Sequence, residues 1–141
     1  MIEVVNRQRK RKIDAQQWKA FGASALNVLP VKNGNATVVF VSDRAMALLN
    51  RRWRGKRGTT DVLSFPSDEQ PFERSPSVYL GDVVISIEQA ARQAKQNRMS
   101  LNNEIEQLIL HGLIHLCGHD HATDDGEMNR LELKLRKKLG I

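Results

Sequence analysis

The sequence predicts an α+β fold in which one mixed, four-stranded sheet is covered by helices. Short runs rich in β-branched residues, typical of strands, are interspersed with longer stretches whose apolar residues recur every three or four positions, as in amphipathic helices. Strands and helices do not alternate strictly, which argues against a regular parallel α/β architecture. The 141 residues contain no internal repeat and no linker-like segment. We therefore expect one domain spanning residues 1–141.

Four segments are expected to form the strands of this sheet. The clearest is ATVVFV, at positions 36–41, because β-branched side chains suit a buried sheet. Turn and breaker residues bound the segments, such as Asn33-Gly34 before the second strand and Pro66 after the third. Residues 67–78 are polar, contain two prolines and are expected to form a loop. The expected strands are Ile2–Asn6, Ala36–Val41, Asp61–Phe65 and Leu80–Ile87.

Five helices are expected, and several carry a start signal. Asp14, Ser42 and Ser100 are residue types that accept hydrogen bonds from the first free N–H groups of a helix. Pro30 ends the first helix. In the second helix, Met46, Leu49 and Trp53 lie along one apolar side. The expected helices are Asp14 to Leu29, Asp43–Arg52, Glu88–Arg98, Leu101–Cys117 and Asp124–Leu139.

The helix Leu101–Cys117 is expected to be central, because its second half is apolar on nearly all sides. It also contains Gly112, although glycine costs up to about 1 kcal/mol in a helix interior. Close approach of another backbone, or of a substrate, would explain why a glycine is tolerated there.

All four histidines of the chain lie in residues 111–121 of this region. His111 and His115 are four residues apart and so share one helix face. Gly118 can end the helix through a left-handed residue, and the turned chain can then bring back His121. Three nitrogen ligands leave one coordination position open, as in catalytic zinc sites. The alternative is a buried helix whose histidines only form hydrogen bonds. Three histidines at this spacing favour a bound metal instead. The metal could also be nickel, copper or iron, which such sites accept as well.

The residues around the histidines restrict the chemistry. Zinc peptidases with this spacing place a glutamate base directly after the first histidine, where this chain has Gly112. Glu104 precedes His111 by two helical turns and is expected near the ligands or at the surface rather than as the base. Asp120 could orient a ligand imidazole, or could only cap its loop. Cys117 points away from the histidine face and is expected to serve packing.

The net charge of +6 and the pI near 9.8 come from clustered basic residues. Such clusters attract a polyanion, most simply a nucleic acid. A solvated basic surface is the alternative and is sufficient for the third cluster. The second cluster is interrupted by Trp53 and two glycines, so we expect a loop around Arg54 rather than a plain helix surface. The clusters are Arg7, Arg9, Lys10, Arg11 and Lys12; Arg51, Arg52, Arg54, Lys56 and Arg57; and Lys134, Arg136, Lys137 and Lys138.

Three blocks of the sequence resemble the YbeY endoribonucleases, the bacterial rRNA maturation factors. Residues His111–His121 match the hallmark H-G-x-x-H-L-x-G-[YH]-D-H throughout. The segment from Trp53 to Pro66 is similar to R-G-x-x-x-x-T-[DN]-V-L-S-F-P, and Leu80–Ser86 is similar to L-G-D-[IV]-x-I. The resemblance runs from about Val38 to Leu131.

The resemblance implies a zincin-like fold with a central metal-binding helix and one Zn²⁺ per chain. It implies His111, His115 and His121 as zinc ligands and Arg54 as the basic residue needed for activity. We expect further site residues around these. Asp120, Ser64 and His119 are expected to contact the ligands or the substrate, and Arg51, Arg52, Lys56 and Arg57 to bind RNA.

The expected function is therefore a zinc-dependent, single-strand-specific endoribonuclease that matures the 3′ end of 16S rRNA and serves ribosome quality control. Its partners would be ribosomal RNA, the small ribosomal subunit and ribosome-assembly proteins, with no organic cofactor. The lone cysteine and the lack of a long apolar run favour the cytoplasm and no membrane contact. Two alternatives are a metalloprotease-like hydrolase, disfavoured by Gly112, and a non-catalytic assembly factor that zinc only stabilises.

Overall fold

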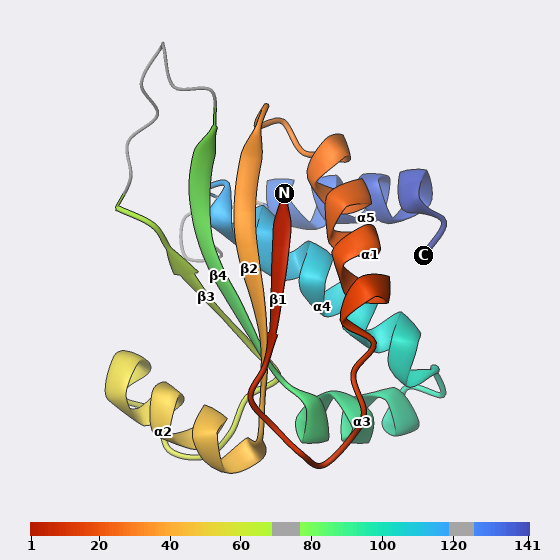
Figure 1. Cartoon of the computed structure of the whole chain (residues 1–141). Helices are drawn as coiled ribbons and strands as arrows, with labels where there is room; N and C mark the ends of the chain where they lie inside the picture. Colours follow the sequence, from red (N-terminus) through yellow and green to blue (C-terminus); the bar gives the residue numbers. More distant parts are fainter. Residues whose placement is uncertain (69–76, 119–125) are drawn as a thin grey trace.

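The computed structural model describes residues 1–68, 77–118 and 126–141. Within these residues the chain forms one mixed four-stranded sheet with helices on both of its faces, as the sequence predicted (Figure 1). None of these helices is both long and apolar enough to cross a bilayer. The strands are β1 (Ile2–Asn6), β2 (Gly34–Val41), β3 (Val62–Pro66) and β4 (Val78–Ser86); the helices are α1 (Ala15–Val28), α2 (Asp43–Arg54), α3 (Ile87–Gln96), α4 (Leu101–Leu116) and α5 (Glu127–Leu139).

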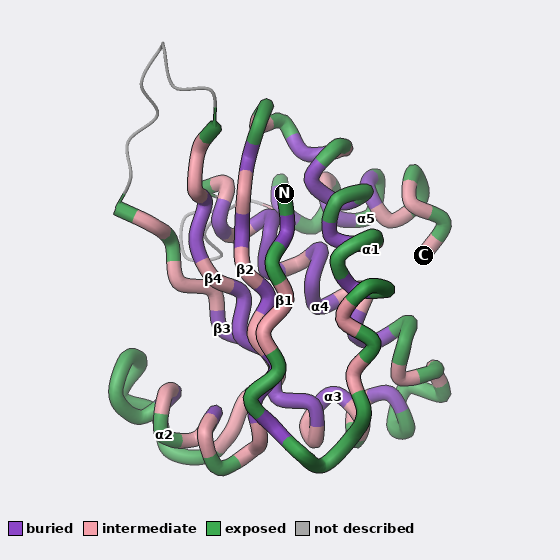
Figure 2. Tube along the Cα trace, in the orientation of Figure 1, coloured by how far each residue is buried: buried purple, intermediate pink, exposed green. Residues whose placement is uncertain are grey.

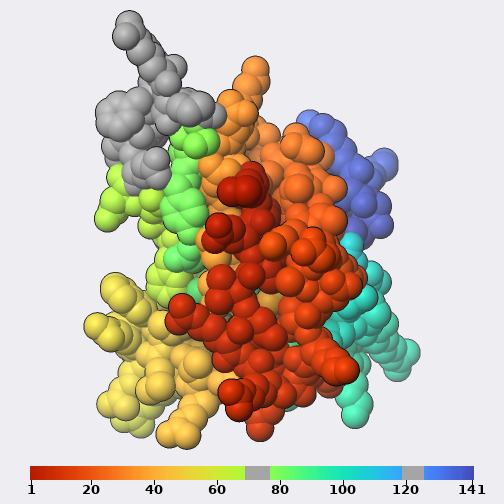
Figure 3. All heavy atoms as spheres, in the orientation of Figure 1, coloured from red at the N-terminus to blue at the C-terminus, as the bar shows by residue number. Residues whose placement is uncertain are grey.

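The sheet has the strand order β1-β2-β4-β3. The pairs β1–β2 and β2–β4 are parallel, whereas β3 runs antiparallel to β4 along one edge. Side chains alternate between the two faces of β4: Val83 and Ile85 join the main core, and Val84 joins a smaller cluster with Met46 of α2. The sheet therefore has α1, α4 and α5 on one face and α2 on the other, where α2 forms the lower left corner of the molecule (Figures 1 and 3).

Helix α4 occupies the centre of the main core, as its apolar composition predicted. Ile109, Leu113 and Ile114 are fully buried, and the helix contacts α1, α3, α5, β3 and β4. Figure 2 shows the buried stretch of α4 behind the sheet, while the outer surfaces of α1 and α2 are exposed. A helix buried in this way provides a rigid support for the two histidines near its C-terminal end.

Three of the predicted helix starts are confirmed by capping hydrogen bonds. Asp14 accepts a hydrogen bond from the backbone N–H of Gln17 at 3.2 Å, and Ser42 and Ser100 cap α2 and α4 in the same way. Ser86 is the last residue of β4 and also caps α3. Consequently β4 ends one residue earlier than expected, and it begins two residues earlier, at Val78.

The predicted end of α2 was wrong by two residues. The helix continues through Arg52 to Arg54 and stops at Gly55, whose φ of 64° is left-handed. Arg51, Arg52 and Arg54 of the second basic cluster thus lie on the last helical turn, while Lys56 and Arg57 lie in the loop that follows. Trp53, which the sequence placed on the apolar side with Met46, is 62% exposed.

Gly112 is explained by the sheet beneath α4 and not by a neighbouring backbone or a substrate. A Cβ at this position would lie 2.5 Å from Cγ1 of Val83 and 3.2 Å from Oγ of Ser64. The Ser64 hydroxyl also donates a hydrogen bond of 3.1 Å to the carbonyl oxygen of Gly112. The missing side chain therefore lets α4 pack directly on β3 and β4.

Gly112→Ala should lower the free energy of unfolding by about 1–2 kcal/mol. The added methyl group overpacks the contact with Val83, at a cost of about 1–3 kcal/mol, and this outweighs a gain of up to about 1 kcal/mol in helix propensity. Urea denaturation in the presence of a chelator measures the change. In a Val83→Ala background the same substitution should cost less, and equal costs in both backgrounds would contradict the steric explanation.

Candidate active site

A groove of about 560 Å³ lies where α2, the edge strand β3 and the end of α4 meet. Its walls contain four of the residues that the sequence analysis selected: Arg54 from α2, Ser64 from β3, and His111 and His115 from α4. These residues come from separate parts of the sequence and from both faces of the sheet. Gly118 also lines the groove, while His119, Asp120 and His121 lie outside the described residues.

The two histidines of the groove face one another. Their Nε2 atoms are 3.2 Å apart, and the rings make an edge-to-face contact with centroids 4.7 Å apart. Two nitrogens that bind one tetrahedral zinc at about 2.0–2.1 Å are themselves about 3.3 Å apart. The separation thus fits two ligand positions of a single ion. It also fits a hydrogen bond between the two imidazoles when no ion is bound.

The other ring nitrogen of His111 is bound by a residue that the sequence analysis missed. Nδ1 of His111 lies 2.5 Å from Oε1 of Glu132 on α5, whose side chain is only 10% exposed. A carboxylate accepts hydrogen bonds, so Nδ1 donates, and the lone pair of a neutral ring is then on Nε2, facing His115. Metal-bound histidines commonly have such a carboxylate partner.

Glu132 is itself fixed from the next turn of α5. Nη2 of Arg136 donates to its second carboxylate oxygen at 2.9 Å. Glu132 follows Met128 by four residues on the inward side of α5, and both are buried. A charged residue on an apolar helix face was therefore the sequence signal that could have revealed it, because buried charges need partners.

A second hollow, of about 300 Å³, adjoins the other side of His111 and includes Glu104. Glu104 is 5% exposed, so it is not at the surface, and it lines this hollow together with His111. Nε2 of Gln93 donates to Oε1 of Glu104 at 3.3 Å and to Oδ2 of Asp61 at 3.0 Å. Burial raises the pKa of Glu104 above its ordinary value.

In the part of the chain that the structure describes, Ser64 and Cys117 make contacts that hold the fold together. The Ser64 hydroxyl lines the groove, but its proton is used in the hydrogen bond to the Gly112 carbonyl that joins β3 to α4. Cys117 ends α4, packs against the main core as expected, and burial raises the pKa of its thiol.

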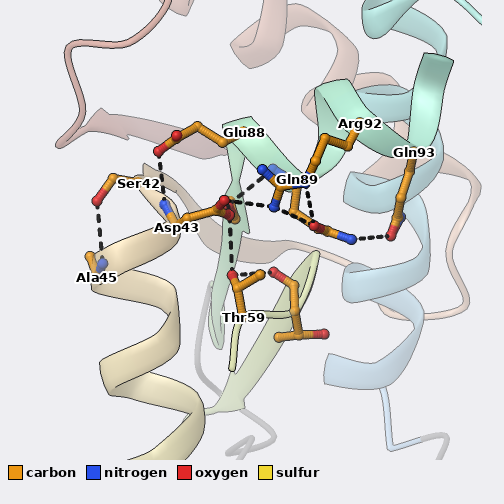
Figure 4. Close-up of polar contacts among 10 residues, drawn as sticks. Ser42, Asp43, Ala45, Thr59, Glu88, Gln89, Arg92 and Gln93 are labelled. Atoms are coloured by element: carbon orange, nitrogen blue, oxygen red, sulfur yellow. Dashed lines mark hydrogen bonds and ion pairs between the residues drawn. The ribbon is translucent and has the colours of Figure 1, made fainter. Parts of the chain in front are cut away.

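The position of α2, and with it Arg54, depends on a polar cluster around Asp43 (Figure 4). The carboxylate of Asp43 accepts hydrogen bonds from Ser86 at 2.6 Å and Thr59 at 3.2 Å, and pairs with Arg92 of α3 at 2.6 Å. The backbone N–H of Asp43 donates to Glu88 of α3 at 3.1 Å. The N-terminal end of α2 is thereby joined to the junction of β4 and α3.

The C-terminal end of α2 leads into the groove. Asn50 is buried and donates from Nδ2 to the carbonyl oxygen of Gly58 at 3.0 Å, which holds the loop after the helix. Among the residues of the second basic cluster, only Arg54 lines the groove. The others are exposed on the last turn of α2 and in the loop that follows: Arg51, Arg52, Lys56 and Arg57.

Comparisons with known proteins agree on one family. Residues 3–140 match the family model of "Endoribonuclease YbeY". A curated relative with that name from Anaeromyxobacter sp. is 40% identical over 90% of this chain, and the match spans 66% of the relative. Another from Thermodesulfovibrio yellowstonii is 35% identical, with 98% of this chain and 96% of the relative covered.

A solved structure shows the same fold. The solution structure of TM1509 from Thermotoga maritima superposes with a TM-score of 0.67 and covers 99% of this chain and 89% of its own. At 22% identity this similarity concerns the fold alone. It supports the α+β arrangement described above.

Asp43→Asn should destabilise the protein by about 1 kcal/mol at neutral pH, because it removes the charge that pairs with the partly exposed Arg92. Burial alone would raise the pKa of Asp43, but hydrogen bonds from Ser86, Arg92 and Thr59, together with the charge of Arg92, outweigh it and hold the pKa below 3.8. A carboxyl group whose pKa is lower in the folded protein than in the unfolded chain stabilises the fold at pH values above its unfolded pKa. This stabilisation is lost as the pH falls through its pKa in the folded protein.

The difference between wild type and Asp43→Asn should therefore be constant above about pH 5 and shrink below about pH 4. Urea denaturation at several pH values measures it. Asp14→Asn is the matched control, since asparagine caps a helix as well as aspartate does. A difference that widens on acidification would contradict the role of the Asp43 charge.

Proposed function

The chain belongs to the YbeY endoribonuclease family, and from this premise we propose that it is a metal-dependent endoribonuclease that cleaves single-stranded RNA in the groove between α2, β3 and α4. One observation carries the proposal: the facing Nε2 atoms of His111 and His115 and the side chain of Arg54 line the same groove. Nitrogen ligands and a guanidinium at one site suit the hydrolysis of a phosphodiester.

The residues present fit a zinc ion. His111 and His115 would supply two ligands from one helix face, and Glu132 would hold the His111 ring with Nε2 toward the groove. His121, three residues beyond Gly118, is the proposed third ligand and lies outside the described residues. When bound, such an ion would supply Lewis-acid chemistry: it lowers the pKa of water toward neutrality, so that hydroxide is available as a nucleophile near neutral pH.

The remaining chemistry belongs to the side chains of the groove. Arg54 would bind two nonbridging phosphate oxygens through its planar guanidinium and stabilise the negative charge that grows on them during cleavage. Arg51, Arg52, Lys56 and Arg57, all exposed beside the groove, would bind flanking phosphates. Glu132 and Arg136 would act at a distance, by keeping the His111 ring in one orientation.

We propose ribosomal RNA as the substrate, with cleavage near the 3′ end of 16S rRNA, a role in ribosome quality control and a cytoplasmic location where that substrate occurs. The small ribosomal subunit and ribosome-assembly proteins would be its partners. These details rest on the resemblance and on the basic surface.

A metalloprotease is the second candidate for a histidine-based site. The structure gives a steric argument against it, because position 112, where zinc peptidases have their glutamate base, has no room for a side chain: a Cβ there would lie 2.5 Å from Val83. The third candidate function is that of a non-catalytic assembly factor whose fold zinc only stabilises. Metal removal that leaves the biological role intact would favour it.

One divalent ion per chain is expected in the purified protein, and His111→Ala, His115→Ala and His121→Ala should each lose it, because two nitrogen ligands bind zinc far more weakly than three. His119→Ala should keep it. Elemental analysis checks the occupancy. Full occupancy in His121→Ala together with loss in His119→Ala would show that His119 is the third ligand.

Metal affinity also tests the role of Glu132. Glu132→Gln should weaken metal affinity by about 10–100-fold, the usual effect of removing a carboxylate partner of a ligand histidine. Glu106→Gln, a matched change on the half-buried side of α4, should leave the affinity unchanged. Competition with a chromophoric chelator gives both affinities, and thermal melting verifies that the variants are folded.

Arg54→Ala should lower RNA cleavage by about two orders of magnitude while metal content and thermal stability stay nearly unchanged, because the side chain is exposed and contributes to the transition state rather than to folding. Lysine should restore activity only in part, since a point charge cannot bind two oxygens in the same plane. Single-turnover cleavage of a labelled oligoribonucleotide measures these effects.

Arg51→Ala is the matched control for Arg54→Ala, because it removes the same charge from the same helical turn outside the groove. It should weaken binding modestly and leave the chemical step unchanged. Equal losses in the two variants would show that Arg54 contributes only general charge. Loss of metal or of folding in Arg54→Ala would show a structural role.

A further inference from the structure

Trp53 is an exposed aromatic residue on the last turn of α2, next to Arg54, which lines the groove. It is 62% exposed, whereas the other tryptophan of the chain, Trp18, is 2% exposed in the core. Among the exposed large apolar residues in the described part of the chain, Trp53 is the aromatic one. The last turn of α2, to which it belongs, is exposed at the surface (Figure 2).

The ring is held in place by two neighbours. It makes an edge-to-face contact with Phe65 of β3, with centroids 6.0 Å apart and an interplanar angle of 73°. The guanidinium carbon of Arg52 lies 5.6 Å from the ring centroid. Contacts on two sides restrict the side chain before anything binds, so a ligand that covers the exposed part loses little conformational entropy.

The charge around Trp53 selects the kind of ligand. Exposed cations occupy the positions on both sides of it in the sequence: Arg51, Arg52, Arg54, Lys56 and Arg57. A planar aromatic surface among cations matches the two parts of a nucleotide, since the base stacks on the ring and the phosphate pairs with arginine. Bases within a duplex are already stacked on one another, so only an unpaired base can reach the ring.

We infer that Trp53 forms a stacking site for one unpaired nucleobase next to the phosphate that is held in the groove. This inference rests on the proposed function and deepens it, because it assigns the preference for single-stranded RNA to a particular residue. Arg52 has a double role in it: it holds the indole ring and can bind the neighbouring phosphate. Trp53 is thus a residue that determines specificity and takes no part in the chemical step.

The test compares a single-stranded oligoribonucleotide with an oligomer of the same length that has phosphates and sugars but no bases. Trp53→Ala should weaken binding of the intact oligomer about 10–100-fold, the usual effect of removing one stacking ring, and should not affect the abasic oligomer. Trp53→Tyr should keep most of the affinity. Leu48→Ala is the matched control, because Leu48 is on the same helix and 64% exposed but has no ring.

Fluorescence gives an independent readout of the stacked state. The intact oligomer should quench the emission of wild-type protein, and Trp53→Phe, which retains only the buried Trp18, should show no quenching. The abasic oligomer should quench neither protein. Gel electrophoresis after each titration verifies that the oligomer is uncut.

Three results would overturn the inference. Equal affinity of wild type and Trp53→Ala for the intact oligomer would show that binding is electrostatic, and so would equal quenching by intact and abasic oligomers. In either case the proposed nuclease would stand if RNA were still cleaved. An equal effect of Trp53→Ala on duplex RNA would also exclude a site for an unpaired base. Absence of RNA binding to any variant at low salt would instead contradict the proposed function itself.

Discussion

The contact between Gly112 and the sheet is the constraint on which the site depends. Because Gly112 has no side chain, Val83 and Ser64 pack against the backbone of α4, and the Ser64 hydroxyl binds the Gly112 carbonyl at 3.1 Å. This contact fixes both the depth and the rotation of the helix. A rotation by one residue, about 100°, would carry the two histidines away from the groove. The same helix therefore supplies the centre of the core and two residues of the candidate site.

The groove forms beside the edge strand β3, where helices from the two faces of the sheet come together. Helix α4 packs on one face of the sheet and α2 on the other, so histidines and Arg54 can reach the same groove only beside that edge. Each wall has its own support. Glu132 holds His111 from α5, and the Asp43 cluster joins α2 to α3 and β4. The exposed arginines and the indole of Trp53 lie on the last turn of α2, next to Arg54 in the sequence.

Much of the fold could be predicted from sequence because its signals are local. Serine and aspartate caps, proline and glycine breaks and the apolar character of α4 each act within a few residues. The end of α2 was missed because an arginine-rich turn resembles a loop until Gly55 is seen to terminate a helix. Trp53 was expected on the apolar side, but the last turn of α2 leaves it 62% exposed. The pair of His111 and Glu132 joins different helices, and helical periodicity does not report such contacts. His119, Asp120 and His121 lie outside the described residues, so their predicted roles stay predictions.

The central claim is that the histidine groove cuts RNA with one metal ion per chain. The most direct measurement is to titrate zinc into metal-free protein and follow the initial rate of cleavage of a single-stranded oligoribonucleotide. We expect no cleavage without metal and a rate that rises linearly and levels off at one equivalent of zinc. Undiminished cleavage by the metal-free protein, or no cleavage at any zinc content by a protein that binds the oligomer, would contradict it.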